Sequence, residues 1–395
     1  MDTDAEVRAE NAARTSYGRL LALLAARTHD VASAEDALAD AFERALTRWP
    51  LDGVPDDPDA WLLTVARNRQ RDRWKSAAER TTVHFDDAEH DGAAPEAGRD
   101  RRLELLLVCA HPDLAGASVP LMLNTVLGFT AAQIGAAFLV PTATMAARLT
   151  RAKKRIARDR IPFEVPGPTD LAGRLAPVLE AVYGSYAMEW PTPPRERHAL
   201  LLGLAGTIAD AAPSVAEAHG LAALLYLSSA RLPARVDEDG RYVPLAQQDP
   251  RRWDRDFVAA GHRHLRTAHA FGSVGRFQLE AAIGAVHCAR GAGEAPDWAH
   301  LRRLYDALLG LAPTRGAAVA RAAVVAETDG ARAGLDALDT LDGVERLQSA
   351  WALRASLLDR LGDPAADAAY AKAISLTTDP AEREYLGRRA RGTGR

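Results

Sequence analysis

The segment 128–163, GFTAAQIGAAFLVPTATMAARLTRAKKRIARDRIPF, restricts the fold of this chain more than any other stretch. Apolar residues recur at helical spacing on both sides of a short break, FLVP, at residues 138–141. Two helices joined by a break of three or four residues are typical of a helix-turn-helix. Thr142 follows Pro141 and is a favourable N-cap residue, so we expect it to cap the second helix.

The second of these helices is predicted to have two different faces. Its apolar residues recur at spacings of four, three and four and should pack on the preceding helix: Met145, Leu149, Ala152 and Ile156. The opposite face carries small residues first and cations later: Ala143, Ala147, Arg151, Lys154 and Arg158. Such a face suits a major groove, because small side chains permit close approach and cations meet phosphates or guanine edges. Alternatively, the cations only complement the helix dipole.

A second basic helix is predicted at residues 57–80, DPDAWLLTVARNRQRDRWKSAAER. Helical spacing groups Trp61, Val65, Asn68 and Asp72 on one side and Arg67, Gln70, Arg71 and Trp74 on the other. Arginines interleaved with an exposed tryptophan suit a surface that tracks a single strand and stacks its bases. The alternative is a solvated face on which Trp74 is half-buried.

The preceding segment, ASAEDALADAFERALTRW at residues 32–49, predicts an amphipathic helix with a core stripe of Leu38, Phe42, Ala45 and Trp49. Its other face is charged, with Asp36, Asp40, Glu43 and Arg44. A charged helix face is usually only solvated, and the alternative is a docking face for a partner.

The rest of the sequence predicts an all-α protein of two or three domains. Its 395 residues are 48% hydrophobic and 6% aromatic, and alanine and leucine, both strong helix formers, dominate. A net charge of −4 restricts any DNA binding to local patches. An acidic stretch at 84–100 reads as a flexible linker, 161–170 is a proline-rich joint, and a longer interruption at 236–250 suggests a hairpin-like insertion. Towards the end, WALRASLLDRLGDPAADAAYAKAISLTTDP is typical of a tetratricopeptide-like helical pair.

Other candidate sites are weaker. Gln278, Glu280 and His287 share a helix and could line a ligand pocket, but a hydrogen-bonded structural role is favoured. Cys109 with His111, and His262 with His264, are too isolated for a zinc site. The sequence has no phosphate loop and no nucleophile elbow, so we expect no enzyme, no cofactor and no metal. The distant cysteines, the acidic start and the lack of a membrane-spanning run predict a cytoplasmic protein without membrane contact.

Taken together, AEDALADAF…RW, DPDAWLLTVARNRQRDRWK, the acidic linker and FTAAQIGAAFLVPTATMAARLTRAKKRI resemble, in that order, a bacterial sigma factor of the extracytoplasmic-function group. This resemblance covers residues 10–160. LLLVCAHPDL, IPFEVP, PLAQQDPRRWD and FQLEAAIGAVH extend it to the subfamily with a tetratricopeptide-like extension, often labelled group 42. The implied organisation is a region-two helical domain at 8–78, an acidic linker at 79–100, a region-four helix-turn-helix domain at 101–160, the joint at 161–170 and the extension at 171–395.

The resemblance also implies roles for single residues. Asp36, Asp40, Glu43 and Arg44 match the surface that docks on the clamp helices of RNA polymerase core. Trp61, Arg67, Asn68, Arg69, Arg71, Arg73 and Trp74 match the helix that melts and reads the −10 element. Thr142, Thr144, Ala146, Ala147, Arg148, Thr150, Arg151 and Lys154 match the helix that faces the −35 element. Many relatives have an apolar residue in place of Arg71, and an Arg and a Ser in place of Ala146 and Ala147, which predicts a distinct promoter preference.

The implied partners are RNA polymerase core, through its clamp helices and flap, and promoter DNA. The linker would be threaded through the RNA path of the polymerase, or it is only a tether. The extension would regulate the factor in cis, with an unidentified protein or small ligand as its partner, and we expect it to pack on the sigma domains. Two alternatives remain: a stand-alone helix-turn-helix regulator that binds operators as a dimer, and a repeat-domain scaffold that binds a protein.

Overall fold

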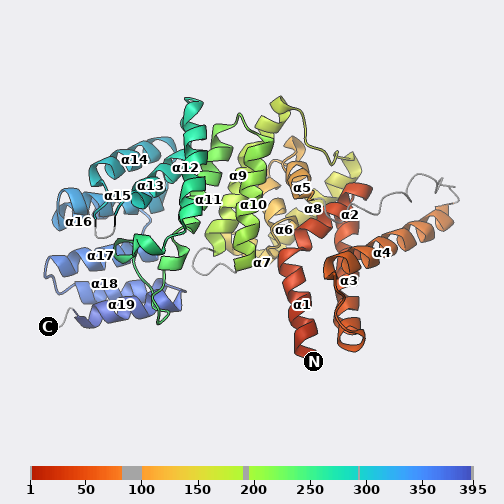
Figure 1. Cartoon of the computed structure of the whole chain (residues 1–395), viewed down its shortest axis with the longest axis horizontal. Helices are drawn as coiled ribbons and strands as arrows, with labels where there is room; N and C mark the ends of the chain where they lie inside the picture. Colours follow the sequence, from red (N-terminus) through yellow and green to blue (C-terminus); the bar gives the residue numbers. More distant parts are fainter. Residues whose placement is uncertain (1, 82–99, 190–194, 292–293, 393–395) are drawn as a thin grey trace. The chain divides into compact units, whose positions relative to one another are not determined.

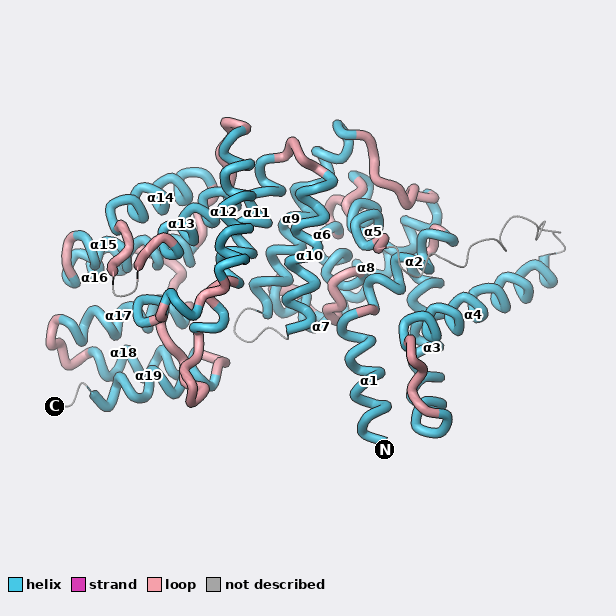
Figure 2. The backbone as a smooth tube through the Cα atoms, in the orientation of Figure 1, coloured by secondary structure: helices cyan, strands magenta, loops and turns pink. Residues whose placement is uncertain are grey.

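A computed structural model describes residues 2–81, 100–189, 195–291 and 294–392, and in these ranges every regular element is a helix (Figures 1 and 2). The expected all-α fold is confirmed. Most of the predicted linker, residues 82–99, lies outside the described residues. The chain divides into two compact units, Met1–Ile208 and Ala209–Arg395.

The first unit begins with four helices that form one packed group. They are α1 (Asp2–Thr15), α2 (Tyr17–Thr28), α3 (Val31–Asp52) and α4 (Pro58–Thr81). The Asp30 side chain caps α3 by accepting a hydrogen bond from the Ser33 amide at 3.0 Å. α3 packs along α4, and it buries Leu38, Ala45 and Trp49 of the predicted stripe while Phe42 is half-buried.

One prediction for α4 was wrong. Gln70 was expected beside Arg71 and Trp74 on the outer face, but it is buried with Leu62, Leu63 and Ala66. These four residues recur at spacings of one, three and four, which is the inner stripe of a helix. The polar amide group of Gln70 suggested an exposed position, but the side chain is buried in the core.

The unit continues with α5 (Arg102–Cys109), α6 (Ser118–Thr125), α7 (Ala131–Ala137) and α8 (Thr142–Asp159). The last two are joined by a short turn, and we refer to α7, this turn and α8 as the helix-turn-helix. α7 begins with a capping box, in which Thr130 and Gln133 exchange hydrogen bonds between side chain and backbone. In the turn, Leu139 takes a left-handed φ of 55°, and the Val140 amide donates to the Gly135 carbonyl at 2.8 Å.

Gly135 permits this tight turn. A Cβ atom there would lie 2.6 Å from the Val140 carbonyl oxygen, so a larger residue would push the turn away from α7. α8 buries Met145, Leu149, Ala152 and Ile156, which confirms the predicted apolar stripe. Its cap is Pro141 and not Thr142, which is already the first helical residue.

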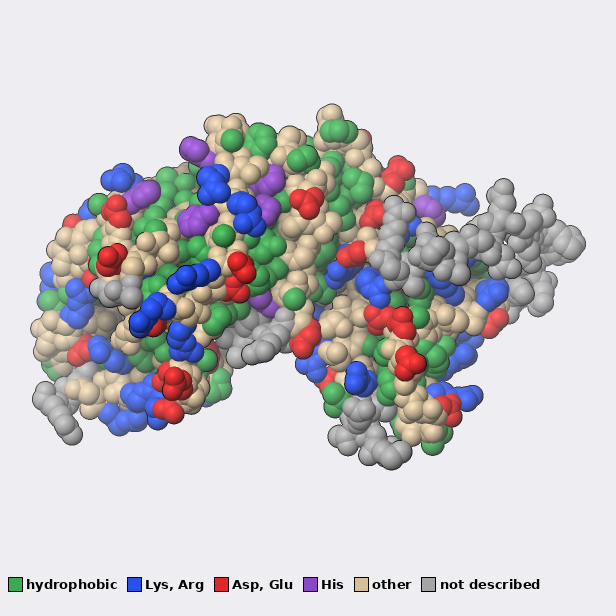
Figure 3. Space-filling model, in the orientation of Figure 1, with side chains coloured by type: hydrophobic (Ala, Val, Ile, Leu, Met, Phe, Trp, Pro, Cys, Tyr) green, Lys and Arg blue, Asp and Glu red, His purple; other side chains and the backbone are tan. Residues whose placement is uncertain are grey.

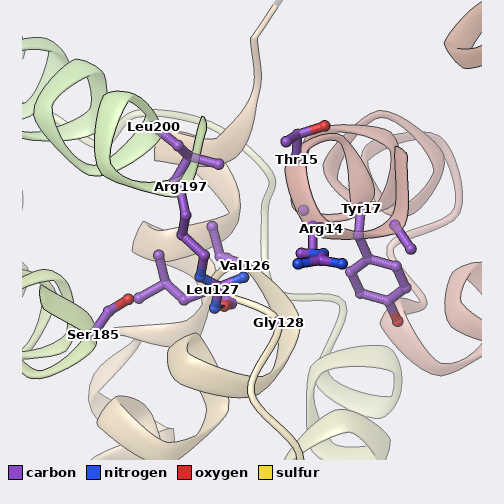
Figure 4. Close-up of a pocket in the computed structure, with 11 residues that line it drawn as sticks. Arg14, Thr15, Tyr17, Val126, Leu127, Gly128, Ser185, Arg197 and Leu200 are labelled. Atoms are coloured by element: carbon purple, nitrogen blue, oxygen red, sulfur yellow. Dashed lines mark hydrogen bonds between the residues drawn. The ribbon is translucent and has the colours of Figure 1, made fainter. Parts of the chain in front are cut away.

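Two further helices complete the first unit, although the predicted extension was expected to begin at residue 171. α9 (Pro168–Glu189) packs on α5 and α6, and α10 (Arg195–Ala211) follows it. The Arg197 guanidinium donates to the Leu127 carbonyl, pairs with Glu189 at 2.6 Å and lies 4.8 Å above the centre of the Phe129 ring. Figure 4 shows this arginine reaching from its helix to the turn at Leu127 and Gly128. The beginning of the extension therefore packs on the segment that leads into α7.

A small cavity adjoins this contact. It is lined by Tyr17, Gly128, Ser185 and Arg197 among others, and its volume of about 10 Å³ has room for one water molecule at most (Figure 4). It is a packing defect and not a ligand site.

The second unit contains α11 (Ala216–Ser229), α12 (Arg255–Ala270), α13 (Arg276–Cys288), α14 (Trp298–Leu311), α15 (Arg315–Thr328), α16 (Ala331–Asp339), α17 (Gln348–Arg360), α18 (Ala366–Leu376) and α19 (Pro380–Gly392). Each helix from α13 onwards packs on the next one along the chain. The hairpin-like insertion between α11 and α12 is reduced to one antiparallel bridge, between Val236 and Tyr242.

Candidate nucleic-acid interface

The predicted reading face of α8 lies on the surface of the first unit. Thr142, Thr144, Ala146, Ala147, Thr150, Arg151 and Lys154 are exposed, and Arg148 is half-exposed. In the free chain two of these side chains bond to their own helix. The Thr150 hydroxyl donates to the Ala146 carbonyl at 3.0 Å, and the Arg151 Nε donates to the Ala147 carbonyl at 3.2 Å. Both contacts can be exchanged for a ligand without disturbing the core.

Lys153 has a different role from its neighbour Lys154. Its ammonium lies 2.7 Å from both carboxylate oxygens of Glu35 on α3 and 2.7 Å from the Asn124 Oδ1 on α6. Both Lys153 and Glu35 are largely buried. Burial raises the pKa of Glu35, and the nearby Lys153 charge counteracts part of that rise.

This three-residue contact, Lys153 with Glu35 and Asn124, was missed by the sequence interpretation. It joins the helix-turn-helix to the first helical group, because α3 packs on both α4 and α8. A signal was present, since Lys153 lies four residues after Leu149 and three before Ile156, on the edge of the apolar stripe. A cation at such an edge is half-buried and needs an anion. The identity of that anion, 118 residues away, could not be read from the local pattern.

The two predicted charged sets on α3 and α4 are bound to each other. The Arg69 Nε donates to the Asp40 carboxylate, and the Arg73 Nη1 donates to the Asp36 Oδ2 at 3.0 Å. The predicted polymerase-docking acids are thus the partners of two predicted −10 arginines. The Arg73–Asp36 pair is exposed and the Arg69–Asp40 pair is only partly buried, so each contributes about 1 kcal/mol or less to folding.

The other predicted residues of α3 and α4 are distributed between the surface and the core. Glu43, Arg44, Asn68 and Arg71 are exposed, and the Arg71 guanidinium donates to the Asn68 Oδ1. Trp74 is 46% exposed, as a base-stacking side chain requires. Arg67 is half-buried. Trp61 is also half-buried and packs edge-on against Trp49 with ring centres 5.6 Å apart, so Trp61 supports the fold.

The weaker candidates of the sequence differ in their surroundings. Glu280 pairs with Arg276, Gln278 bonds to Glu217, and burial lowers the pKa of His287 to about 4. Cys109 is buried beside the Thr125 hydroxyl, and burial raises the pKa of its thiol to about 12.

Across the described ranges, no three His, Cys, Asp or Glu side chains come together as a metal site. In those same ranges, no helix combines the length and the apolarity needed to cross a bilayer.

Comparisons with known proteins fit this geometry. Residues 13–80, which contain α3 and nearly all of α4, match the model of sigma-70 region 2. Residues 174–269 match a family of unknown function (DUF6596). An uncharacterized protein of Rhizobium meliloti (strain 1021), R00370, is 35% identical over 384 residues, which span 89% of this chain and 88% of that protein.

No solved structure matches the chain. The match to the Rhizobium meliloti relative extends over most of both proteins. Sigma-70 factors are a non-enzymatic class of transcription factors that bind RNA polymerase. The chain therefore belongs to the same family as the Rhizobium meliloti protein, and its region 2 domain makes it a sigma-70 family factor.

Proposed function

We propose that this sigma factor is of the extracytoplasmic-function type and directs RNA polymerase core to particular promoters. α4 would capture the melted −10 element and α8 would read the −35 element. The observation that carries the proposal is the pairing, in one compact unit, of a region 2 domain with a helix-turn-helix whose outer face is free. The polymerase makes the phosphodiester bond, and this chain supplies sequence readout and strand capture.

On α8, readout would be divided between base edges and phosphates. Ala146 and Ala147 leave the middle of the exposed face without long side chains, so the helix can approach the groove floor closely. Arg148 and Arg151 would then donate to guanine edges, and Lys154, nearer the end of the helix, would bind phosphate. Contacts to phosphate fix the register, and contacts to bases select the promoter.

On the first helical group, polymerase docking and DNA capture would be linked through shared charges. Asp36 and Asp40 hold Arg73 and Arg69 in the free chain. When these acids dock on the cationic clamp surface of the polymerase, the two arginines lose their partners and become available to the DNA backbone. The exposed Trp74 lies one residue beyond Arg73 and would stack on an unpaired base.

The extension would regulate promoter readout in cis. What supports this role is the contact of Arg197 with the Leu127 carbonyl and the Phe129 ring, directly before the α7 capping box. A change in α10 would therefore alter the base of the helix-turn-helix. The later helices would form a tetratricopeptide-like array for an unidentified protein or small ligand, as their chain-order packing suggests.

Run-off transcription with purified core polymerase on genomic promoter fragments tests the proposal. The full chain should support initiation, and the pair Arg148→Ala and Arg151→Ala should abolish it at −35-dependent promoters. Absence of core binding and of initiation would overturn the proposal. Tight duplex binding by a dimer without polymerase would instead identify a stand-alone regulator.

A second comparison addresses the extension, using the full chain and a chain that ends at Ala211, where α10 ends. This truncation keeps Arg197 and its contacts in the first unit, whereas a truncation after Pro166 would remove them. If the two truncations behave alike, regulation lies in the second unit. If only the shorter chain is defective, the Arg197 contact is the important element.

A further inference from the structure

α12, in the second unit, has an unusually uneven distribution of charge around its axis. At about 100° per residue, its outer arc contains the exposed Arg255, Arg266 and His269 and the half-buried His262 within roughly 60°, with the exposed Arg263 beside them. We call these five residues the α12 stripe. Asp256 in the first turn is the acidic residue of this helix. Figure 3 shows Arg and His side chains gathered along α12 on the face that is turned to the viewer.

The arginines of this stripe differ from many others in the same unit. Arg302, Arg321 and Arg354 each pair with an aspartate on a neighbouring helix. By contrast, the guanidinium groups of Arg255, Arg263 and Arg266 make no hydrogen bond or ion pair with any residue in the described ranges. Three exposed cations on one helix, unpaired within the part of the chain that the structure describes, form a surface of net positive charge.

The inner face of α12 fixes the orientation of the stripe. Ala260, Gly261 and Ala268 are buried, and a Cβ atom on Gly261 would lie 2.6 Å from the Leu227 Cγ on α11. The close approach of α12 to α11 therefore depends on this glycine. The helix cannot rotate about its axis without exposing this small-residue face, so the stripe stays on the surface.

We propose that the α12 stripe binds the phosphate backbone of duplex DNA, as a second DNA contact of this sigma factor outside the two promoter-reading helices. The stripe extends from Arg255 to His269, a rise of about 21 Å along the helix at 1.5 Å per residue. That length corresponds to roughly six phosphates along one strand. Non-specific backbone binding needs exposed cations, and Arg255, Arg263 and Arg266 supply three. Burial and the nearby Arg266 charge lower the pKa of His262, so this histidine favours its neutral form.

The composition of the arc favours a polyanion over a protein partner. Besides the basic residues, it contains one acid, Asp256 beside Arg263, and the small residues Ala259, Thr267 and Ala270. Protein interfaces depend on large apolar or aromatic anchors in desolvated pockets, and this arc has none. A membrane surface would require an exposed apolar helix face, whereas the apolar face of α12 is packed on α11. The choice of duplex DNA as the polyanion rests on the proposed promoter function.

With this contact, the domain of unknown function would have a role in binding DNA. That domain is matched over residues 174–269, so it ends at the last residue of the stripe. A sigma factor with this addition would hold promoter DNA more tightly, and its salt dependence would be steeper, without any change in sequence preference.

The test uses the full chain with a 30-base-pair duplex of arbitrary sequence, so that it does not depend on promoter recognition. Dissociation constants are measured from 50 to 200 mM KCl for the wild type and for the triple variant Arg255→Gln, Arg263→Gln, Arg266→Gln. Each lost phosphate contact should reduce the salt slope by about 0.9, and at 50 mM the affinity should fall roughly 10- to 100-fold. The polymerase holoenzyme on a promoter fragment should show a slope change in the same direction.

The matched control removes three paired arginines from the same unit, as Arg302→Gln, Arg321→Gln and Arg354→Gln. It has the same net charge as the stripe variant and should keep the wild-type slope. Equal slopes for wild type, control and stripe variant would overturn the proposal. So would loss of core polymerase binding in the stripe variant with an unchanged DNA slope, because the occupant would then be a protein. If the stripe result holds but no promoter is transcribed, the sigma-factor function fails and the DNA contact stands.

Discussion

The first unit contains two basic helices, α4 and α8, that treat their cations in opposite ways. On α4, Arg69 and Arg73 are held by acids of the neighbouring helix α3. On α8, the exposed cations of the predicted reading face bond only to their own helix within the described ranges, whereas Lys153 is largely buried and binds Glu35. The difference shows that a basic sequence does not by itself tell whether the cations of a helix are paired within the protein or exposed without a partner on another helix. The exposed cations of α8 can meet a ligand without breaking a contact to another helix, whereas Arg69 and Arg73 of α4 must first leave Asp40 and Asp36.

The largest effect is expected where the cations are free. Replacing Arg148 and Arg151 by Ala removes two donors from the reading face without touching the buried stripe. Each bidentate base contact contributes about 1–3 kcal/mol of discrimination, so promoter affinity should fall at least tenfold while thermal stability is unchanged. Electrophoretic mobility shifts of the holoenzyme, with thermal unfolding in parallel, measure both quantities. An unchanged affinity would show that α8 is not the reader.

A smaller effect, on stability and not on binding, is expected at Lys153. Substituting Ala leaves the Glu35 carboxylate and the Asn124 amide without their shared partner in a largely buried place. The loss of a partner from such a group costs about 1–3 kcal/mol, which denaturant unfolding measures. Lys154→Ala on the exposed side of the same helix is the control and should cost less than 0.5 kcal/mol. Equal losses for the two variants would contradict the contact described between α3 and α8.

The smallest effect on stability is expected for the α3–α4 pairs. Changing Asp36 and Asp40 to Asn frees Arg73 and Arg69, and the folding cost should stay below about 1 kcal/mol per pair because one pair is exposed and the other only partly buried. Binding of the free chain to single-stranded DNA should nevertheless increase, whereas binding to core polymerase should decrease. Fluorescence anisotropy with labelled DNA and with labelled core separates the two changes. If DNA binding does not increase, the acids do not restrain α4.

The local sequence pattern was sufficient to predict the helices, but not the contacts between residues far apart in the sequence. The four-residue stripe of α8 was predicted residue by residue, because helical periodicity is a property of the segment itself. Gln70 was placed on the wrong face of α4, since its chemistry was weighed above its spacing. The pairs Lys153–Glu35 and Arg69–Asp40 depend on which helices meet in three dimensions, and no single segment encodes that.

The position of α9 and α10 shows the same limit. The proline-rich joint at 161–170 reads as a domain boundary, yet the compact first unit extends to Ile208. Pro168 begins α9 and does not end a domain, because proline is tolerated in the first turn of a helix. Only the packing of α9 on α5 and α6 shows that the chain turns back onto the sigma domains after the joint.

Leu139 lies in the turn between α7 and α8 with a left-handed backbone and a side chain that is 92% exposed. A non-glycine residue in that conformation costs about 1–2 kcal/mol, and the exposed leucine gains nothing from burial. Directed evolution for thermostability should therefore reach Leu139→Gly early. Because the side chain lies in the turn before α8, this substitution should raise the melting temperature without changing the exposed face of α8.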